Sequence, residues 1–164
     1  LRLSNTDSLT GLANRQKLSS SMAEAMIRSH QFELPFSVLL LDVDNFKHVN
    51  DTYGHLAGDT VLQALSAIAV NGLRPQDTAG RWGGEEFLVL LPETAAAAAV
   101  ELAENLRSRV DAHVFGQDLH CSISIGVAEM RSNDTPDSLV HRADTALYRA
   151  KKAGKNRVVF VEDE

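Results

Sequence analysis

The stretch Arg81-Trp82-Gly83-Gly84-Glu85-Glu86-Phe87, continued by Leu88-Val89-Leu90-Leu91, joins a glycine pair, two carboxylates and an apolar run. Adjacent glycines before an apolar run are typical of a tight turn that leads into a buried strand. The glycine pair permits positive φ angles and lets a ligand approach the backbone closely. The two glutamates supply hard oxygen ligands at the mouth of that strand. Taken alone, the stretch is equally consistent with an ordinary hairpin whose acidic side chains are solvated.

Composition limits the class of protein. The 164 residues, 44% of them hydrophobic, are enough for a single domain spanning 1–164. A net charge of −6 without a long basic run argues against nucleic-acid binding. The lone Cys121 excludes an internal disulfide and suits the cytoplasm. There is no signal peptide and no apolar run near the roughly 18 residues of a membrane span, so we expect no membrane contact by this domain.

Apolar patterns alternate between helical and strand periods along the chain, which predicts an α/β sheet protein. A nearly continuous apolar run over 36–44 indicates a central strand. In the first helix we expect Leu18, Met22, Ala25 and Ile27 to face inward. We expect a strand over 121–127 to have one packed face. The expected helices cover about 14–30, 45–53, 55–70, 94–110 and 136–153, with Asn14, Thr94 and Thr135 as N-caps, and the last strand covers 157–161.

Two aspartates close the predicted central strand. We expect Asp42 and Asp44 to lie on opposite faces, so that only one of them faces a given site. The functional interpretation pairs Asp42 with Glu85 across neighbouring strand ends, where two carboxylates, a backbone carbonyl and phosphate oxygens can hold one or two Mg²⁺ ions. For Asp44 we favour a structural hydrogen bond or a helix cap.

Several familiar sites are absent from the sequence. The loop that begins at Asp42 is no EF-hand, because Phe46, Lys47 and Tyr53 stand where an oxygen ligand, Gly and Glu are needed. The histidines lack zinc-site spacing. No Walker-A loop precedes Lys155. Lys151 and Lys155 are consistent either with complementing a helix dipole or with binding a triphosphate, and Lys47 is a third candidate for phosphate binding.

Five blocks of the sequence together resemble the GGDEF domain, the catalytic domain of diguanylate cyclases. The resemblance spans nearly the whole chain in the family's order. It implies a mostly antiparallel five-stranded sheet flanked by helices, a ferredoxin-like or palm-type core as in nucleotide cyclases. It also implies condensation of two GTP into cyclic di-GMP plus two pyrophosphate. The blocks are DSLTGLANR (7–15), DVDNFKHVNDTYGHLAGD (42–59), RWGGEEF (81–87), SISIGVA (122–128) and ADTALYRAKKAGKNR (143–157).

The resemblance also implies roles for individual residues. Mg²⁺ (or Mn²⁺) would lie on Asp42, the Val43 carbonyl and Glu85, with Glu86 close by. Glu85 would help to deprotonate the attacking 3′-hydroxyl, with Lys47 beside it in the reaction. The substrate-binding residues would be Asn50 and Asp59 for guanine, Leu9 and Phe46 for the base pocket, Gly83 and Gly84 at the turn, and Lys47, Lys151 and Lys155 for the phosphates.

Arg74-Pro75-Gln76-Asp77 lies five residues before Gly83 and matches the family's RxxD product-inhibition pattern. The alternative is a weak surface ion pair. Where the family often has an arginine on the next helix, this chain has Asn105. Cross-protomer inhibition is therefore expected to be weaker, or to use Arg107 or Arg109.

The implied partners are GTP, cyclic di-GMP and a second copy of the domain. Because the chain begins with Leu1, we expect it to be the C-terminal fragment of a longer signalling protein, either cytoplasmic or membrane-anchored. Its sensory or dimerisation region would lie upstream. One alternative is a degenerate domain that senses a nucleotide without turnover, although the glycines and carboxylates are intact. Another is a cyclase for a different cyclic dinucleotide. Asp59 argues against it, since a carboxylate accepts from guanine N1–H and the 2-amino group.

Overall fold

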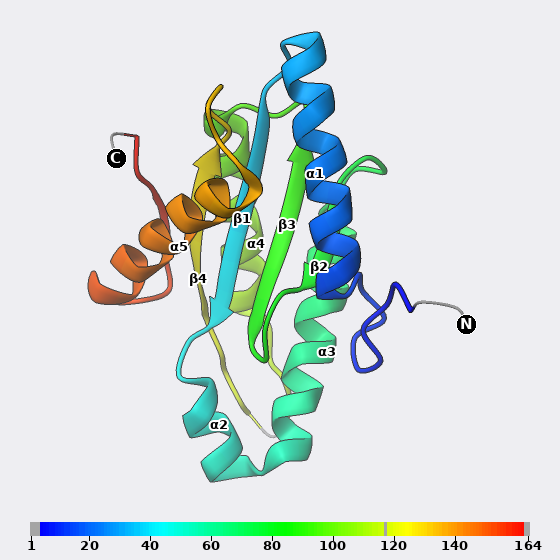
Figure 1. Cartoon of the computed structure of the whole chain (residues 1–164). Coiled ribbons are helices and arrows are strands. Elements are labelled where there is room, and N and C mark those ends of the chain that lie inside the picture. The colour runs from blue at the N-terminus through cyan, green and yellow to red at the C-terminus, as the bar shows by residue number, and fades with distance from the viewer. Residues whose placement is uncertain (1–3, 117, 163–164) are drawn as a thin grey trace.

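Five strands form one sheet in the order β2-β3-β1-β4-β5 in the computed structural model of the chain, which describes residues 4–116 and 118–162 (Figure 1). All neighbouring strands run antiparallel except β4 and β5. The expected mostly antiparallel sheet with flanking helices is confirmed. Residues 1–3, 117 and 163–164 of the expected domain 1–164 lie outside the described residues. The elements are α1 (Arg15–Phe32), β1 (Phe36–Val43), α2 (Phe46–Tyr53), α3 (His55–Asn71), β2 (Thr78–Arg81), β3 (Glu86–Pro92), α4 (Ala96–Ala112), β4 (Ile123–Glu129), α5 (Pro136–Lys152) and β5 (Val158–Phe160).

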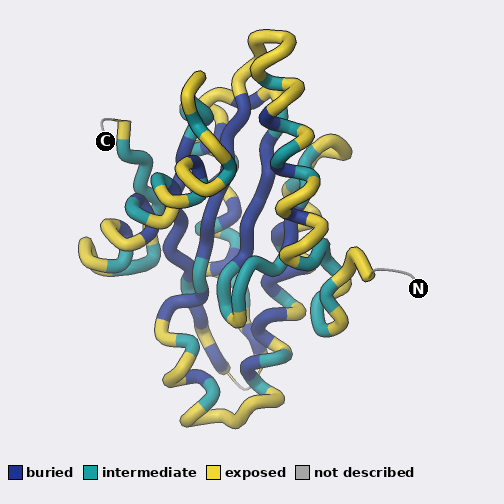
Figure 2. Tube along the Cα trace, viewed as in Figure 1, coloured by how far each residue is buried: buried dark blue, intermediate teal, exposed yellow. Residues whose placement is uncertain are grey.

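Two helical layers cover the sheet, with α1 and α5 on one face and α3 and α4 on the other (Figure 1). Residues 36, 38 and 40 of β1 pack with α1 and α5, whereas residues 39, 41 and 43 pack with α3 and α4. This alternation follows from the two-residue period of a strand. Figure 2 shows the resulting buried centre along the strands. Leu18 and Met22 of α1 are buried as expected, but the next buried residue is Met26. The expectation for Ile27 is wrong, because this residue is 66% exposed.

The prediction of one packed face for β4 is wrong. Its residues from Ile123 to Ala128 are all buried, because helices cover both faces of this strand. Gly126 permits the covering by α5, since a Cβ at this position would lie 2.1 Å from the Ala143 carbonyl oxygen and 2.4 Å from the Leu147 nitrogen. Gly126 therefore marks a close contact between α5 and β4.

Local capping was predicted correctly for two helices. The Asn14 side chain accepts from the Lys17 N–H, and Thr135 forms a reciprocal capping box with Ser138. The prediction of Thr94 as a cap is wrong. The Ala96 N–H of α4 donates instead to the Glu129 carboxylate at 2.6 Å, a contact supplied by β4. None of the described helices is long and apolar enough to cross a membrane.

Candidate active site

Three acidic residues, Asp42, Glu85 and Glu86, stand where β1 ends and β3 begins. Asp42 pairs with Glu86 in the β1–β3 register, and Glu85 precedes β3 by one residue. The Val43 N–H donates to the Glu85 carbonyl oxygen at 3.4 Å, which ties the two segments together. The Asp42 side chain is 16% exposed, and its Oδ2 lies 2.9 Å from Nζ of Lys151 on α5. The sheet therefore gathers the carboxylates that the sequence pointed to, and α5 adds a cation.

The negative charge at this point of the sheet is incompletely compensated. Burial and then the neighbouring Asp42 carboxylate raise the pKa of Glu85 from its ordinary value of 4.5 to about 7. Burial and the charges of Asp42 and Asp144 also raise the pKa of Glu86. Lys151 acts in the opposite direction on both glutamates. Carboxyl groups in such surroundings favour a bound proton or a bound cation.

Asp42 supplies the observation that best indicates a cation site. Its Oδ1 is buried and is the one such side-chain atom without a hydrogen-bond partner in the described residues, an arrangement that a protein ordinarily avoids. A carboxylate oxygen of this kind suits a hard divalent cation. The described residues contain no cluster of three or more His, Cys, Asp or Glu side chains that could hold a metal ion. A cation here would therefore need further oxygens from the backbone, water or a phosphorylated ligand.

The glycine pair of the β2–β3 hairpin does not use the positive φ angles that glycine permits. Neither Gly83 nor Gly84 has a positive φ. A Cβ on Gly83 would lie 2.9 Å from Oε1 of Glu86, while one on Gly84 would meet no atom within 4 Å. The turn is held by the Gly83 N–H, which donates to the Glu86 carbonyl oxygen at 3.2 Å, and by Arg81, whose Nη2 donates to the Gly84 carbonyl oxygen at 2.7 Å. Gly84 thus leaves bare backbone beside the carboxylates.

The structural role predicted for Asp44 is confirmed, but the expected opposite orientation of Asp42 and Asp44 is wrong. Residues two apart in a strand share a face, and Asp44 accepts from Ser124, the register partner of Asp42. Asp44 is 4% exposed and accepts from Ser122 Oγ and Ser124 Oγ at 2.7 Å and from the Asn156 N–H at 3.0 Å. Three donors satisfy this carboxylate, so it anchors the α5–β5 loop against the end of β1.

The three candidate phosphate-binding lysines differ in position. Lys151 lies at the carboxylates, as described above. Lys155 donates to the Asn45 side chain at 2.6 Å and so lies at the β1–α2 turn. The structure does not bring Lys47 to the carboxylates: its side chain is 92% exposed, and its ion-pair partner is Asp51 at 3.9 Å. The positive charge near the site therefore comes from Lys151 at the end of α5 and from Lys155 in the loop that follows it.

The predicted base-binding residues come from α2, α3 and the lead-in loop. Phe46 and Leu9 are partly buried against the core cluster on the α3–α4 face of the sheet. Gln63 of α3 donates to the Leu9 carbonyl oxygen at 3.2 Å, which ties the loop to α3. Within residues 4–116 and 118–162, the side chains of Asn50 and Asp59 make no hydrogen bond and no ion pair. Their polar atoms are therefore available to a ligand.

The Arg74–Asp77 pair is more than a surface contact. The Arg74 guanidinium donates to both carboxylate oxygens, at 3.0 and 2.8 Å, and the Arg74 N–H donates to the same group at 2.9 Å. The Asp77 side chain is fully buried, while Arg74 is 42% exposed. The hydrogen bond to Asp77 raises the pKa of Arg74. A fixed, partly exposed guanidinium results.

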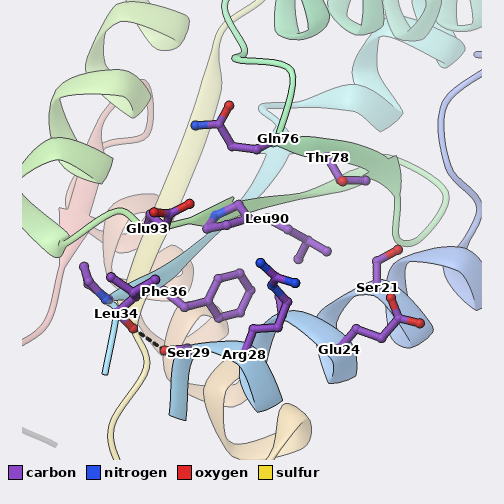
Figure 3. A pocket seen from close by; sticks show the side chains of 13 residues that line it. Ser21, Glu24, Arg28, Ser29, Leu34, Phe36, Gln76, Thr78, Leu90 and Glu93 are labelled. Atoms are coloured by element: carbon purple, nitrogen blue, oxygen red, sulfur yellow. Dashed lines mark hydrogen bonds between the residues drawn. The ribbon is translucent and has the colours of Figure 1, made fainter. Parts of the chain in front are cut away.

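A pocket of about 190 Å³ lies between α1 and the β2–β3 edge, and Gln76 of the Arg74–Asp77 loop lines it (Figure 3). Arg28 and Glu24 of α1 face the same space. Arg28 carries no local sequence signal, because it lies on an amphipathic helix outside any motif. Arg107, an expected substitute for the missing arginine at Asn105, is engaged by Glu104 and by the Asn156 side chain at 2.8 Å.

Comparisons with known proteins identify the family of the chain. The family described as "Diguanylate cyclase, GGDEF domain" matches residues 4–157. The chain is 42% identical to diguanylate cyclase DgcP of Pseudomonas aeruginosa over 156 residues, which are 93% of this chain and 23% of that protein. It is also 42% identical to the response regulator PleD of Caulobacter vibrioides, over 97% of this chain and 36% of that protein. The chain thus spans about a quarter to a third of these relatives.

Solved structures of GGDEF domains superpose closely on this chain. The GGDEF domain of DgcB from Caulobacter crescentus, solved in complex with c-di-GMP, superposes with a TM-score of 0.94 at 32% identity and covers 99% of both chains. The active GGEEF domain of a diguanylate cyclase from Vibrio cholerae gives a TM-score of 0.89 at 35% identity, covering 93% of this chain and 99% of that one.

Proposed function

The chain belongs to the GGDEF family of diguanylate cyclases, and on that basis we propose that it condenses two GTP molecules into cyclic di-GMP and two pyrophosphate ions. The observation that carries the proposal is the Asp42–Glu85 centre, where Asp42 Oδ1 is buried without a partner and the pKa of Glu85 is raised to about 7. The intact centre also argues for turnover rather than for nucleotide sensing alone.

Mg²⁺ or Mn²⁺ fits the oxygen donors at the end of β1. Asp42, the Val43 carbonyl, Glu85 and Glu86 would hold it. When bound, the cation would neutralise charge on the reacting phosphate and assist the attacking oxygen. The cation needs additional oxygen ligands, and a nucleoside triphosphate supplies them from its own phosphate groups.

The protein's remaining work is positioning and charge compensation. The attack of a 3′-hydroxyl on an α-phosphorus is an in-line displacement that needs little covalent chemistry from side chains. Glu85, whose carboxylate lies beside Asp42, would accept the proton of the attacking hydroxyl. Lys151 is held beside the carboxylates and Lys155 at the β1–α2 turn, and both would pair with phosphate oxygens. Lys47, whose side chain is exposed, would supply a third positive charge to the phosphates.

Guanine recognition is assigned to Asn50 and Asp59, with Leu9 and Phe46 lining the base. The two polar side chains are unoccupied by protein partners in the described ranges, and a carboxylate matches the paired donors of guanine N1 and N2. Adenine lacks that pair. A polar site left without its partner disfavours the wrong base by roughly 1–3 kcal/mol for each lost hydrogen bond.

Two copies of the domain are needed to complete the reaction. Each chain carries one Asp42–Glu85 centre, whereas the product joins two nucleotides with two-fold symmetry. Each copy would therefore present one GTP to the other in an isologous encounter. The domain would be the catalytic part of a longer cytoplasmic signalling protein, whose upstream region raises the local concentration of the pair.

Product inhibition is assigned to the Arg74–Asp77 loop. An oriented guanidinium suits bidentate contact with a phosphate or a guanine edge. Arg28 lies on the opposite wall of the adjoining pocket and would add a second cation (Figure 3). Arg107 is already engaged in the structure, so the contribution of α4 across protomers would be small.

The test is product identification by mass spectrometry. Purified chain incubated with GTP and Mg²⁺ should yield cyclic di-GMP, and Asp42→Asn should abolish the yield although the variant still unfolds in one cooperative thermal transition. Asp137→Asn, at an exposed position in the first turn of α5, is the matched control and should behave like wild type. Tight GTP binding without any dinucleotide would favour the sensing module instead.

A further inference from the structure

Gly58 lies in an unusual position on α3. It is buried near the start of the helix, next to Asp59. A Cβ at this position would lie 2.0 Å from Oδ1 of Asn50, 3.1 Å from Cγ of Asn50 and 3.1 Å from Cζ of Phe46. These atoms belong to α2, so the missing side chain lets the Asn50 amide lie directly against the backbone of α3.

The backbone does not require glycine at this position. Gly58 does not have a positive φ, whereas Gly54, at the turn between α2 and α3, has a φ of 93°. Glycine within a helix is less favourable than alanine. Its presence in a helical conformation therefore points to a requirement for space rather than for a special φ angle.

The space is used by residues of the proposed base pocket. Asn50 is half-buried, and in the described residues no hydrogen bond or ion pair holds its side chain. Packing alone therefore sets where the amide lies. The contact surface is the bare backbone at Gly58 together with its neighbours, and the ring of Phe46 lies on the same spot.

We propose that Gly58 is a positioning residue for base recognition: its missing side chain fixes the Asn50 amide and the Phe46 ring where the nucleotide base is read. The inference rests on the proposed function, and it concerns how the base site is shaped. A side chain at residue 58 would displace the flexible end of Asn50 by more than 1 Å, since ordinary contacts of a Cβ lie at 3.4–4 Å. Such a displacement misaligns a hydrogen bond without disturbing the fold.

Gly58→Ala tests the proposal in two independent readouts. Binding is measured by calorimetry with Mg²⁺ and nucleotide analogues whose α,β-bridging oxygen is methylene, so that pyrophosphate cannot leave. The affinity for the GTP analogue should fall roughly tenfold, the effect of one lost hydrogen bond, while the weak affinity for the ATP analogue stays unchanged. The midpoint of thermal unfolding should stay equal or rise, because alanine favours the helix.

A double-mutant cycle identifies Asn50 as the residue through which Gly58 acts. In an Asn50→Ala background, Gly58→Ala should weaken binding of the GTP analogue by less than about twofold. Gly72→Ala, at the other end of α3, is the control. Its Cβ would lie 3.2 Å from the Arg109 side chain and at ordinary contact distances of 3.7 and 3.9 Å from the carbonyl oxygens of Ala69 and Ile68. This variant should leave binding unchanged.

Three results would overturn the inference: wild-type affinity in Gly58→Ala, a full tenfold loss retained without Asn50, or a lowered unfolding midpoint, which would assign Gly58 to helix packing. Failure of the proposed function gives a different result. In that case the wild-type chain itself would not prefer the GTP analogue over the ATP analogue, before any variant is compared.

Discussion

Glu85→Gln should raise the stability of the fold at neutral and higher pH while it removes catalytic activity. In the folded chain without metal, burial and the Asp42 charge raise the pKa of Glu85 from 4.5 to about 7. Below pH 4.5 both the folded and the unfolded chain carry the proton, so the group does not alter stability. As the pH rises from 4.5 to about 7, the unfolded chain releases its proton first, and the folded state loses stability.

The size of the effect follows from the pKa. A rise from 4.5 to about 7 corresponds to about 3 kcal/mol, and because Glu85 is only partly buried, screening by solvent reduces this to about 1–2 kcal/mol. The glutamine amide carries no charge, so the repulsion between residue 85 and the Asp42 carboxylate is removed. At pH 8 in a chelator, Glu85→Gln should therefore unfold about 3–6 °C above wild type, and most of that difference should vanish at pH 4.5.

The same variant should lose activity. Removing both the proton acceptor and a negative ligand should lower cyclic di-GMP synthesis by about a hundredfold or more. Glu101→Gln, on the exposed face of α4, is the matched control and should change neither property. The measurements are calorimetric unfolding at the two pH values and synthesis rates on the same preparations. The reasoning is refuted if Glu85→Gln is less stable than wild type at pH 8, or if it retains near-normal turnover.

Three other predictions concern the product site, the core and assembly. Arg74→Ala should weaken cyclic di-GMP binding about tenfold or more without lowering initial rates at low product, and equal product affinities in calorimetry would contradict the assignment. Gly126→Ala should destabilise the fold by about 2–3 kcal/mol in denaturant unfolding, because its Cβ would meet the backbone of α5 at 2.1 Å; an unchanged midpoint would show that the helix can shift freely. Synthesis per molecule should rise with enzyme concentration and with a fused dimerising coiled coil, whereas a flat rate from a sedimentation-verified monomer would be incompatible with a two-copy reaction.

Local sequence patterns were sufficient where a few neighbouring residues determine the structure. The apolar run of β1 predicts a strand buried on both faces, and Thr135 with Pro136 predicts the start of α5. The carboxylate centre was also predictable, because Asp42 and Glu85 stand at the ends of two apolar runs that become neighbouring strands.

Contacts between distant segments were not predictable in the same way. Glu129 caps α4 from a strand 33 residues away, so the local candidate Thr94 was misassigned. The pairing of Lys151 with Asp42 depends on how α5 crosses the sheet. Likewise, one packed face was expected for β4, whereas the backbone of α5 lies against Gly126 on the other face.

The reaction stoichiometry tests the central claim most directly. Pyrophosphate and cyclic di-GMP are quantified in one time course with GTP and Mg²⁺, using the wild-type chain at a concentration that permits encounters between copies. If the Asp42–Glu85 centres of two copies each catalyse one displacement, two pyrophosphate ions appear for every cyclic di-GMP, and the linear dinucleotide does not accumulate. A ratio of one with a linear product, or GTP recovered unchanged, would contradict the account.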